Sequence, residues 1–220
     1  MKQDLVIIGT GKTSEVIYEY LKHEYNVIGF AEDKATLGIH SLYKYLPVFP
    51  LDHLDYHVDK TTTKLFTAIS FAQMNNVRTN IYRRMKTNKW QFITYIHPKA
   101  TVAENVYIGD NCIVMEENNI QSFTSIGNNN IIWAGNHIGH HTNIGNNNFI
   151  SSHVVISGNC NIGNNNFFGV NSTIGDSVTI GNYVWFSPCT MTIKDISDYT
   201  LLKGPKPVIH EKTTEEFFNL

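Results

Sequence analysis

Four of the ten histidines lie within seventeen residues of one another, at His137, His140, His141 and His153. The imidazole side chain titrates close to pH 7, so a neutral histidine can accept a proton from a hydroxyl or an amine. Neutral imidazole is also a common nitrogen ligand of zinc. The cluster therefore predicts either a general base or a metal site, and the choice depends on how the chain places these side chains.

The histidines lie inside a segment in which an apolar residue recurs every six positions. The repeat starts at Ile96 and ends at Thr192, and sixteen of its seventeen members are apolar. A helix repeats every 3.6 residues and a strand every two, so neither period maintains a six-residue register over this distance. A repeat of fixed length is instead typical of a solenoid.

A second period of eighteen residues is superimposed on the first. The sequence Ile-Gly-Asn-Asn-Asn begins at Ile126, at Ile144 and again at Ile162. Three six-residue repeats therefore form one turn of a triangular coil, a left-handed parallel β-helix, whose flat sides stack at about 4.8 Å with the aliphatic residues pointing inward. The corners require a positive φ, which glycine and asparagine adopt most readily. His140 and His141 are the third and fourth residues of their repeat, so we expect them at a corner, outside the core.

The sequence before the repeat has a different pattern. A strand over residues 5–8, a Gly-Thr-Gly loop, a helix over 13–21 and a strand over 26–30 form a β-α-β unit. A strand at 64–70 and a helix at 75–86 complete a small Rossmann-like α/β domain with a parallel sheet, and residues 46–51 are expected at its edge. Gly9 and Gly11 would let a phosphate or ribose approach the helix N-terminus, and Asp33 follows the second strand, where a ribose or base ligand is expected. The alternative is an α/β cap that has lost its ligand.

These patterns divide the chain into three parts. Residues 1–92 are expected to form the α/β domain, residues 93–200 the β-helix, and residues 201–220 a tail. The tail ends in a segment, 213–220, with two acidic residues near its start and two phenylalanines beyond. We expect a short helix there, packed on the last coil as a cap.

Composition excludes several classes of function. The net charge is −2, and no stripe of lysine and arginine is present to bind a nucleic-acid backbone. No apolar run approaches the roughly 20 residues that cross a bilayer, and the N-terminus leads into a strand pattern without a signal peptide, so we expect a cytoplasmic protein. Three cysteines without paired spacing predict neither disulfides nor a zinc site.

The six-residue repeat resembles that of the hexapeptide-repeat acyltransferases. With the α/β domain and the segment Ile96-His97-Pro98-Lys99-Ala100 before the repeat, the whole chain resembles the sialic acid O-acetyltransferase and UDP-4-amino-sugar N-acetyltransferase group of bacterial surface-polysaccharide pathways. The resemblance implies acetyl transfer to an amino or hydroxyl group of a nucleotide-linked sugar, in O-antigen, capsule or glycan biosynthesis. It also implies that the N-terminal domain holds the nucleotide-sugar. Acetyl-CoA is then the co-substrate, and a homotrimer forms its active sites at subunit interfaces.

The same resemblance assigns roles to individual residues. His140 matches the general-base position, with His141 as its rival, and Gly158, eighteen residues further on, would donate its N–H to the thioester carbonyl. The remaining assignments place His137 in the acceptor pocket, His153 as a partner from another corner, and Lys203 and Pro205 near the CoA nucleotide. Two positions depart from the family pattern. His141 stands where an aspartate or glutamate usually orients the base, and Phe186-Ser187-Pro188-Cys189-Thr190 stands where small residues usually follow the pantetheine arm.

Two other functions remain open at this stage. Some left-handed β-helices are zinc carbonic anhydrases, which use two histidines five apart and a third from two turns away. The spacings here are three, one and twelve, and Glu117 occupies the position two coils before His153, so we expect no metal. The other alternative is a non-catalytic scaffold. The repeat contains no inserted loop. If the protein is an acetyltransferase, its contacts to CoA must therefore come from the corners and from neighbouring subunits.

Overall fold

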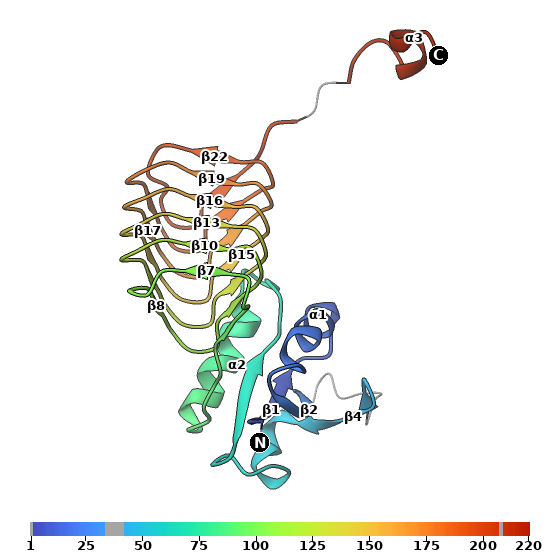
Figure 1. The fold of residues 1–220 in the computed structure, drawn as a ribbon, viewed down its shortest axis with the longest axis vertical. Coiled ribbons are helices and arrows are strands. Elements are labelled where there is room, and N and C mark those ends of the chain that lie inside the picture. The colour runs from blue at the N-terminus through green and yellow to red at the C-terminus, as the bar shows by residue number, and fades with distance from the viewer. Residues whose placement is uncertain (1, 34–41, 207–208) are drawn as a thin grey trace.

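The computed structural model describes residues 2–33, 42–206 and 209–220. A small α/β domain lies against a stack of triangular coils, from which a tail extends (Figure 1). The α/β domain has a five-stranded sheet in the order β3-β4-β2-β1-β5, and only the β3–β4 pair is antiparallel. Its elements are β1 (Asp4–Ile8), α1 (Lys12–Leu21), β2 (Asn26–Glu32), β3 (Leu42–Tyr43), β4 (Leu46–Pro50), a 3-10 helix (Leu51–Tyr56), β5 (Thr63–Thr67) and α2 (Asn76–Thr87).

The predicted parallel sheet is confirmed, and three of its differences from the expected elements have a clear structural cause. β4 lies inside the sheet and not at its edge, because β3 pairs with its outer side. β5 ends at Thr67, three residues earlier than expected, because Ala68 to Ser70 leave the sheet and line a cavity. α2 begins one residue later than expected, because Asn75 has the left-handed conformation with φ 65°.

The predicted left-handed β-helix is confirmed. Each side of a coil is a two-residue strand, and each strand pairs in parallel with the strand eighteen residues later, as Ile113 does with Ile131. One sheet contains β7 (Thr101–Val102), β10 (Asn119–Ile120), β13 (His137–Ile138), β16 (Val155–Ile156), β19 (Thr173–Ile174) and β22 (Met191–Thr192). The second contains β8 (Tyr107–Ile108), β11 (Ser125–Ile126), β14 (Asn143–Ile144), β17 (Asn161–Ile162) and β20 (Thr179–Ile180). The third contains β6 (Tyr95–Ile96), β9 (Ile113–Val114), β12 (Ile131–Ile132), β15 (Phe149–Ile150), β18 (Phe167–Phe168), β21 (Trp185–Phe186) and β23 (Leu201–Leu202).

The aliphatic ladder forms the core of the β-helix, and it is fully buried from Val114 to Phe186. The prediction fails at its first member, since Ile96 at the open end of the stack is 40% exposed. Beyond Thr192 the period shortens, because Ile180 pairs with Ile196 and Trp185 with Leu201, sixteen residues apart.

The asparagine runs satisfy the backbone at one column of corners. We call residues 109–112, 127–130, 145–148, 163–166 and 181–184 the asparagine corner. The middle asparagine of each run has a positive φ, 59° at Asn129 and 63° at Asn147. The last asparagine is buried, and its amide donates to glycine carbonyls, as Asn130 does to Gly127 and to Gly145 at 2.9 Å. These residues are therefore part of the ordered fold, because they satisfy polar groups that the corners would otherwise bury without a partner.

The α/β domain covers one of the three sides of the β-helix. Ile113, Ile131, Phe149 and Phe167 project outward from the sheet that runs from β6 to β23, and they share a buried cluster with β1 and α1. The corner that joins the other two sheets lies opposite the covered side.

The C-terminal helix was predicted correctly, but its position was not. α3 (Thr214–Phe218) begins with a capping box in which Thr213 and Glu216 each bind the other's backbone N–H. None of its residues is buried, and it lies away from the last coil (Figure 1). The capping box stabilises the helix locally, so the helix does not need the expected contact with the coil. Among the described residues, no helix is long and apolar enough to cross a membrane.

Candidate active site

His140 and His141 lie at a corner of the β-helix, as predicted. They connect β13 to β14, both are exposed, and His141 has φ 57°. We call residues 121–124, 139–142, 157–160 and 175–178 the histidine corner. The chain turns there because every sixth residue must adopt the left-handed conformation. The side chains of His140 and His141 lie on the outside of this turn and are exposed, so they are available to a ligand.

The two histidine rings are in contact. Their Nδ1 atoms are 3.1 Å apart, which requires one ring to donate its Nδ1–H and the other to accept. Phe123, one coil earlier, packs on His141 with 4.7 Å between ring centroids. Gln121 accepts the His140 backbone N–H through its side-chain oxygen at 3.1 Å. His141 is therefore placed so that it can orient the His140 ring, and Phe123 and Gln121 contact the pair from the coil before.

The His140 ring lies against Gly158 of the next coil. A Cβ on Gly158 would approach Cε1 of the ring to 2.8 Å and Nε2 to 3.0 Å. The same Cβ would lie 3.1 Å from Oδ1 of Asp176, whose other oxygen accepts a hydrogen bond from Ser177 at 2.8 Å. Only glycine therefore allows the ring to take this position.

The backbone N–H of Gly158 has no acceptor among the described residues. Equivalent N–H groups at the asparagine corner are all satisfied, as at Asn128 and Asn146, by the side chain one coil further on at 2.8 Å. A free N–H beside an imidazole is an arrangement that can bind a developing oxyanion.

The sequence did not indicate three residues that lie around the histidine pair and Gly158: Gln121, Phe123 and Asp176. The eighteen-residue period would have located Phe123 and Asp176, since they stack with His141 and Gly158 respectively. Gln121 carried no such signal, because it contacts a residue nineteen positions later and so does not follow the eighteen-residue period.

The other two histidines of the cluster lie apart from this pair. His137 is half-buried on β13, where it pairs with Val155, so it lies on a sheet that borders the histidine corner. His153 is exposed on the corner between β15 and β16, and its ring lies over Gly135. One chain therefore does not bring His153 to His140.

Lys203 and Pro205 also lie away from the histidine corner. Both side chains are exposed. Gly204, between them, packs against the turn before β22, since a Cβ on Gly204 would lie 2.3 Å from the carbonyl oxygen of Pro188. That turn, with Cys189 at φ 59°, belongs to the same column of corners as His153. The residues expected to bind the CoA nucleotide thus share a corner with His153 and not with His140.

A metal site is not found in the described part of the chain, where no three His, Cys, Asp or Glu side chains are grouped to hold an ion. Cys112 and Cys160 are buried and Cys189 is exposed, and all three are free. Burial raises the pKa of the Cys112 thiol to about 12.

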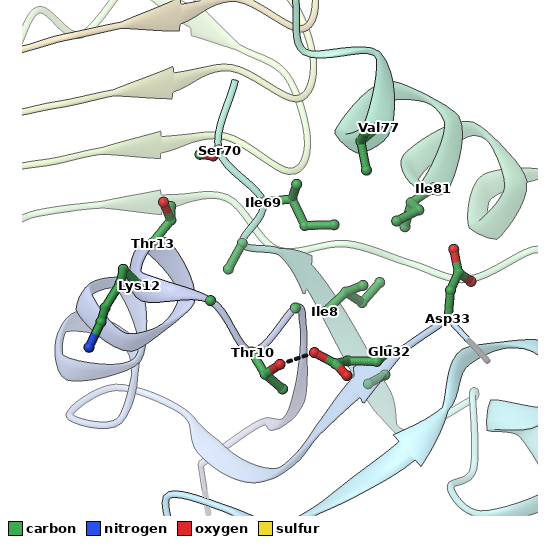
Figure 2. A pocket seen from close by; sticks show the side chains of 14 residues that line it. Ile8, Thr10, Lys12, Thr13, Glu32, Asp33, Ile69, Ser70, Val77 and Ile81 are labelled. Carbon is green, nitrogen blue, oxygen red and sulfur yellow. Dashed lines mark hydrogen bonds between the residues drawn. The ribbon is translucent and has the colours of Figure 1, made fainter. Parts of the chain in front are cut away.

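A cavity of about 370 Å³ lies at the carboxyl ends of β1, β2 and β5. Figure 2 shows Thr10 and Glu32 on one side and Ile69, Val77 and Ile81 on the other. The side chain of Lys12 is 98% exposed. A cavity at this edge of a parallel sheet, next to a helix N-terminus, is where such folds bind nucleotides.

The residues predicted for this cavity do line it. Gly9 has φ 109°, and a Cβ there would lie 3.3 Å from the carbonyl oxygen of Ala68, whereas a Cβ on Gly11 would meet open space. Thr10 donates to Glu32. Asp33 reaches the cavity and is paired with Arg84 of α2, a contact that the sequence did not indicate.

The profile described as bacterial transferase hexapeptide (six repeats) matches residues 123–158. No curated protein sequence matches the chain. The structure is similar to the acetyltransferase domain of PglB from Neisseria gonorrhoeae FA1090, with TM-score 0.81 and 22% identity over 91% of this chain and 96% of that chain. It is also similar to PerB from Caulobacter crescentus in complex with CoA and GDP-perosamine, with TM-score 0.78 and 24% identity over 90% of this chain and 92% of that chain. The chain thus contains a match to the hexapeptide-repeat model and has the same fold as these two proteins.

Proposed function

We propose that this protein transfers an acetyl group from acetyl-CoA to an amino or hydroxyl group of a nucleotide-linked sugar, with His140 as the general base. The observation that carries the proposal is the position of His140 beside the free N–H of Gly158. Support also comes from the structures similar in fold. The PglB domain binds acetyl coenzyme A, and PerB binds CoA and GDP-perosamine.

In this mechanism, the Nε2 atom of His140 accepts the proton of the sugar amine or hydroxyl as that group attacks the thioester carbonyl. The Gly158 N–H donates to the oxygen on which negative charge develops. The tetrahedral adduct then expels the CoA sulfur, which takes the proton from His140, so the products are the acetylated sugar and CoA. For Nε2 to be the free base, Nδ1–H of His140 must donate to Nδ1 of His141 across their 3.1 Å contact.

The complete site needs more than one copy of the chain. The cavity at Gly9 belongs to the domain that covers one side of the β-helix, whereas His140 lies at the opposite corner. We propose a homotrimer in which the histidine corner of one subunit faces the α/β domain of the next. The neighbouring subunit would bring His153 and Lys203, which share another corner, to the CoA that lies between the two β-helices.

The test combines acetyl-CoA with a panel of UDP-, GDP-, dTDP- and CMP-sugars, and mass spectrometry detects the acetylated product. His140→Ala should lower kcat by on the order of a hundredfold or more, with unchanged folding. His210→Ala in the exposed tail is the matched control. Full activity of the His140 variant would refute the assignment of the base. Failure of the purified protein to bind acetyl-CoA in calorimetry would instead support a non-catalytic scaffold, and stoichiometric zinc would support the carbonic anhydrase alternative.

A further inference from the structure

An arginine without a carboxylate partner is buried where the α/β domain meets the β-helix. Arg78, in the first turn of α2, is 0% exposed and is the largest fully buried side chain. No carboxylate of the described residues pairs with it, and burial lowers its pKa to about 9, so it remains charged at neutral pH. An unpaired buried charge is costly unless other groups solvate it.

Backbone carbonyls accept hydrogen bonds from the two terminal nitrogens of the Arg78 guanidinium, whereas its Nε has no partner among the described residues. One terminal nitrogen, Nη2, donates to the carbonyl oxygens of Asn147 and Asn148 at 2.9 and 3.1 Å, and the other, Nη1, donates to that of Ile69 at 3.3 Å. The first two carbonyls belong to the asparagine corner of the β-helix. Ile69, by contrast, lines the cavity in the α/β domain. A single side chain therefore connects the wall of the cavity to the repeat.

The segment between β5 and α2 and the first turn of α2 have other contacts with the same face of the β-helix. The side-chain amide of Asn75 donates to the carbonyl of Asn166 at 3.0 Å. The amide of Asn165 donates to the hydroxyl of Thr79 at 3.1 Å. Phe71 packs against Phe167, with 4.5 Å between ring centroids.

The conformation of this segment requires such support. Gln73, Met74 and Asn75 are three successive residues with φ of 51°, 53° and 65°, a conformation that costs free energy for Gln73 and Met74, whereas asparagine tolerates it better. Without contacts from outside, the segment would relax to another conformation. Ala68, Ile69 and Ser70, which line the cavity, form the start of the same segment, so the shape of the cavity wall depends on the same contacts.

We propose that Arg78 is a positioning residue, which holds the wall of the nucleotide-sugar cavity in place against the β-helix. The identity of the ligand in this inference rests on the proposed function, whereas the connection between the cavity wall and the β-helix through Arg78 does not. Arg78 does not line the cavity. It acts through Ile69, and its loss should loosen the cavity wall while the histidine corner, at the other side of the coil, remains unchanged.

The first test compares Arg78→Met and Arg78→Lys with the wild-type protein. The methionine variant should raise KM for the nucleotide-sugar about tenfold, because the wall loses its fixed position, and should leave KM for acetyl-CoA within about twofold. Lysine should restore part of the loss, since an ammonium group can donate to these carbonyls but lacks the planar fork of arginine. An equal rise of both KM values, or an unchanged KM for the sugar, would overturn the proposal.

Hydrogen–deuterium exchange supplies a measurement that is independent of activity. Amides of residues 68–75 should exchange at least tenfold faster in Arg78→Met, whereas the histidine corner, which does not contact Arg78, should show no change. Unchanged exchange at residues 68–75 would overturn the proposal about Arg78, whether or not the protein accepts a nucleotide-sugar. Failure to accept any nucleotide-sugar would by itself refute only the proposed function.

A milder pair of variants tests the connection if Arg78→Met does not fold. Thr79→Val removes the hydroxyl that accepts from Asn165 and keeps the shape of a buried side chain, and Thr87→Val makes the same change at the exposed end of α2. Thr79→Val should accelerate exchange at residues 68–75 about threefold, and Thr87→Val should match the wild type. Identical exchange in the two variants would count against the proposal.

Discussion

A methyl group at position 158 is the sharpest test of the proposed active site. The backbone of Gly158 does not have a positive φ, so alanine is compatible with its conformation. The added Cβ would lie 2.8 Å from Cε1 of His140, whereas ordinary contacts begin at 3.4 Å. The imidazole ring must therefore move by about 0.6 Å, and the exposed corner gives it room to do so.

We expect Gly158→Ala to lower kcat roughly ten- to hundredfold, because displacements of this size at a reacting group cost about that much. The N–H of residue 158 is retained, and the groups that the methyl meets are side chains that can move, so thermal stability should change little. The assay is steady-state acetylation of the accepted nucleotide-sugar, combined with thermal unfolding.

Gly175→Ala is the matched control. It lies at the same corner one coil further on, where a Cβ would approach Cγ2 of Ile193 at 3.1 Å and not the histidine pair. It should retain wild-type kcat. The reasoning would be refuted if Gly158→Ala had a kcat within threefold of the wild type, or if both alanine variants lost activity equally.

Three further predictions follow from the same structure. His141→Ala should lower kcat about fivefold, since it removes one hydrogen bond of about 1 kcal/mol to His140, whereas His141→Asp supplies a carboxylate acceptor and should retain at least wild-type kcat; equal kcat for the two variants would contradict this role. Native protein should react with a thiol reagent at Cys189 alone and, after denaturation, at Cys112 and Cys160 as well, so rapid loss of all three thiols in the native state would be inconsistent with the burial seen here. The raised pKa of Cys112 means that the folded state keeps a thiol proton that the unfolded chain loses above pH 9, so this stabilisation is present below pH 9 and is lost as the pH rises toward 12. Between about pH 9 and 11, the free energy of unfolding measured with urea should therefore fall less in Cys112→Ala than in the wild type. An equal fall in the two proteins would argue against the raised pKa of Cys112.

The β-helix was predictable because its stabilising contacts recur at a fixed spacing along the sequence. A six-residue ladder determines which side chains point inward, and an eighteen-residue repeat determines which residues stack. Both are visible without coordinates, so the corner positions of His140 and His141 follow from counting. The first coil and the coils after Thr192 were less predictable, since Ile96 lacks a coil beneath it and the later pairs are sixteen residues apart.

The sequence by itself determined the β-helix, the parallel sheet, the exposed histidine pair and the glycine loop of the cavity, because each depends on residue type and spacing along the chain. Only the tertiary structure decided which side of the prism the α/β domain covers, and therefore that the cavity and His140 lie on opposite sides of one chain. It also decided the partners of Arg78 and Asp33, since those contacts join residues far apart in sequence through packing that no period records.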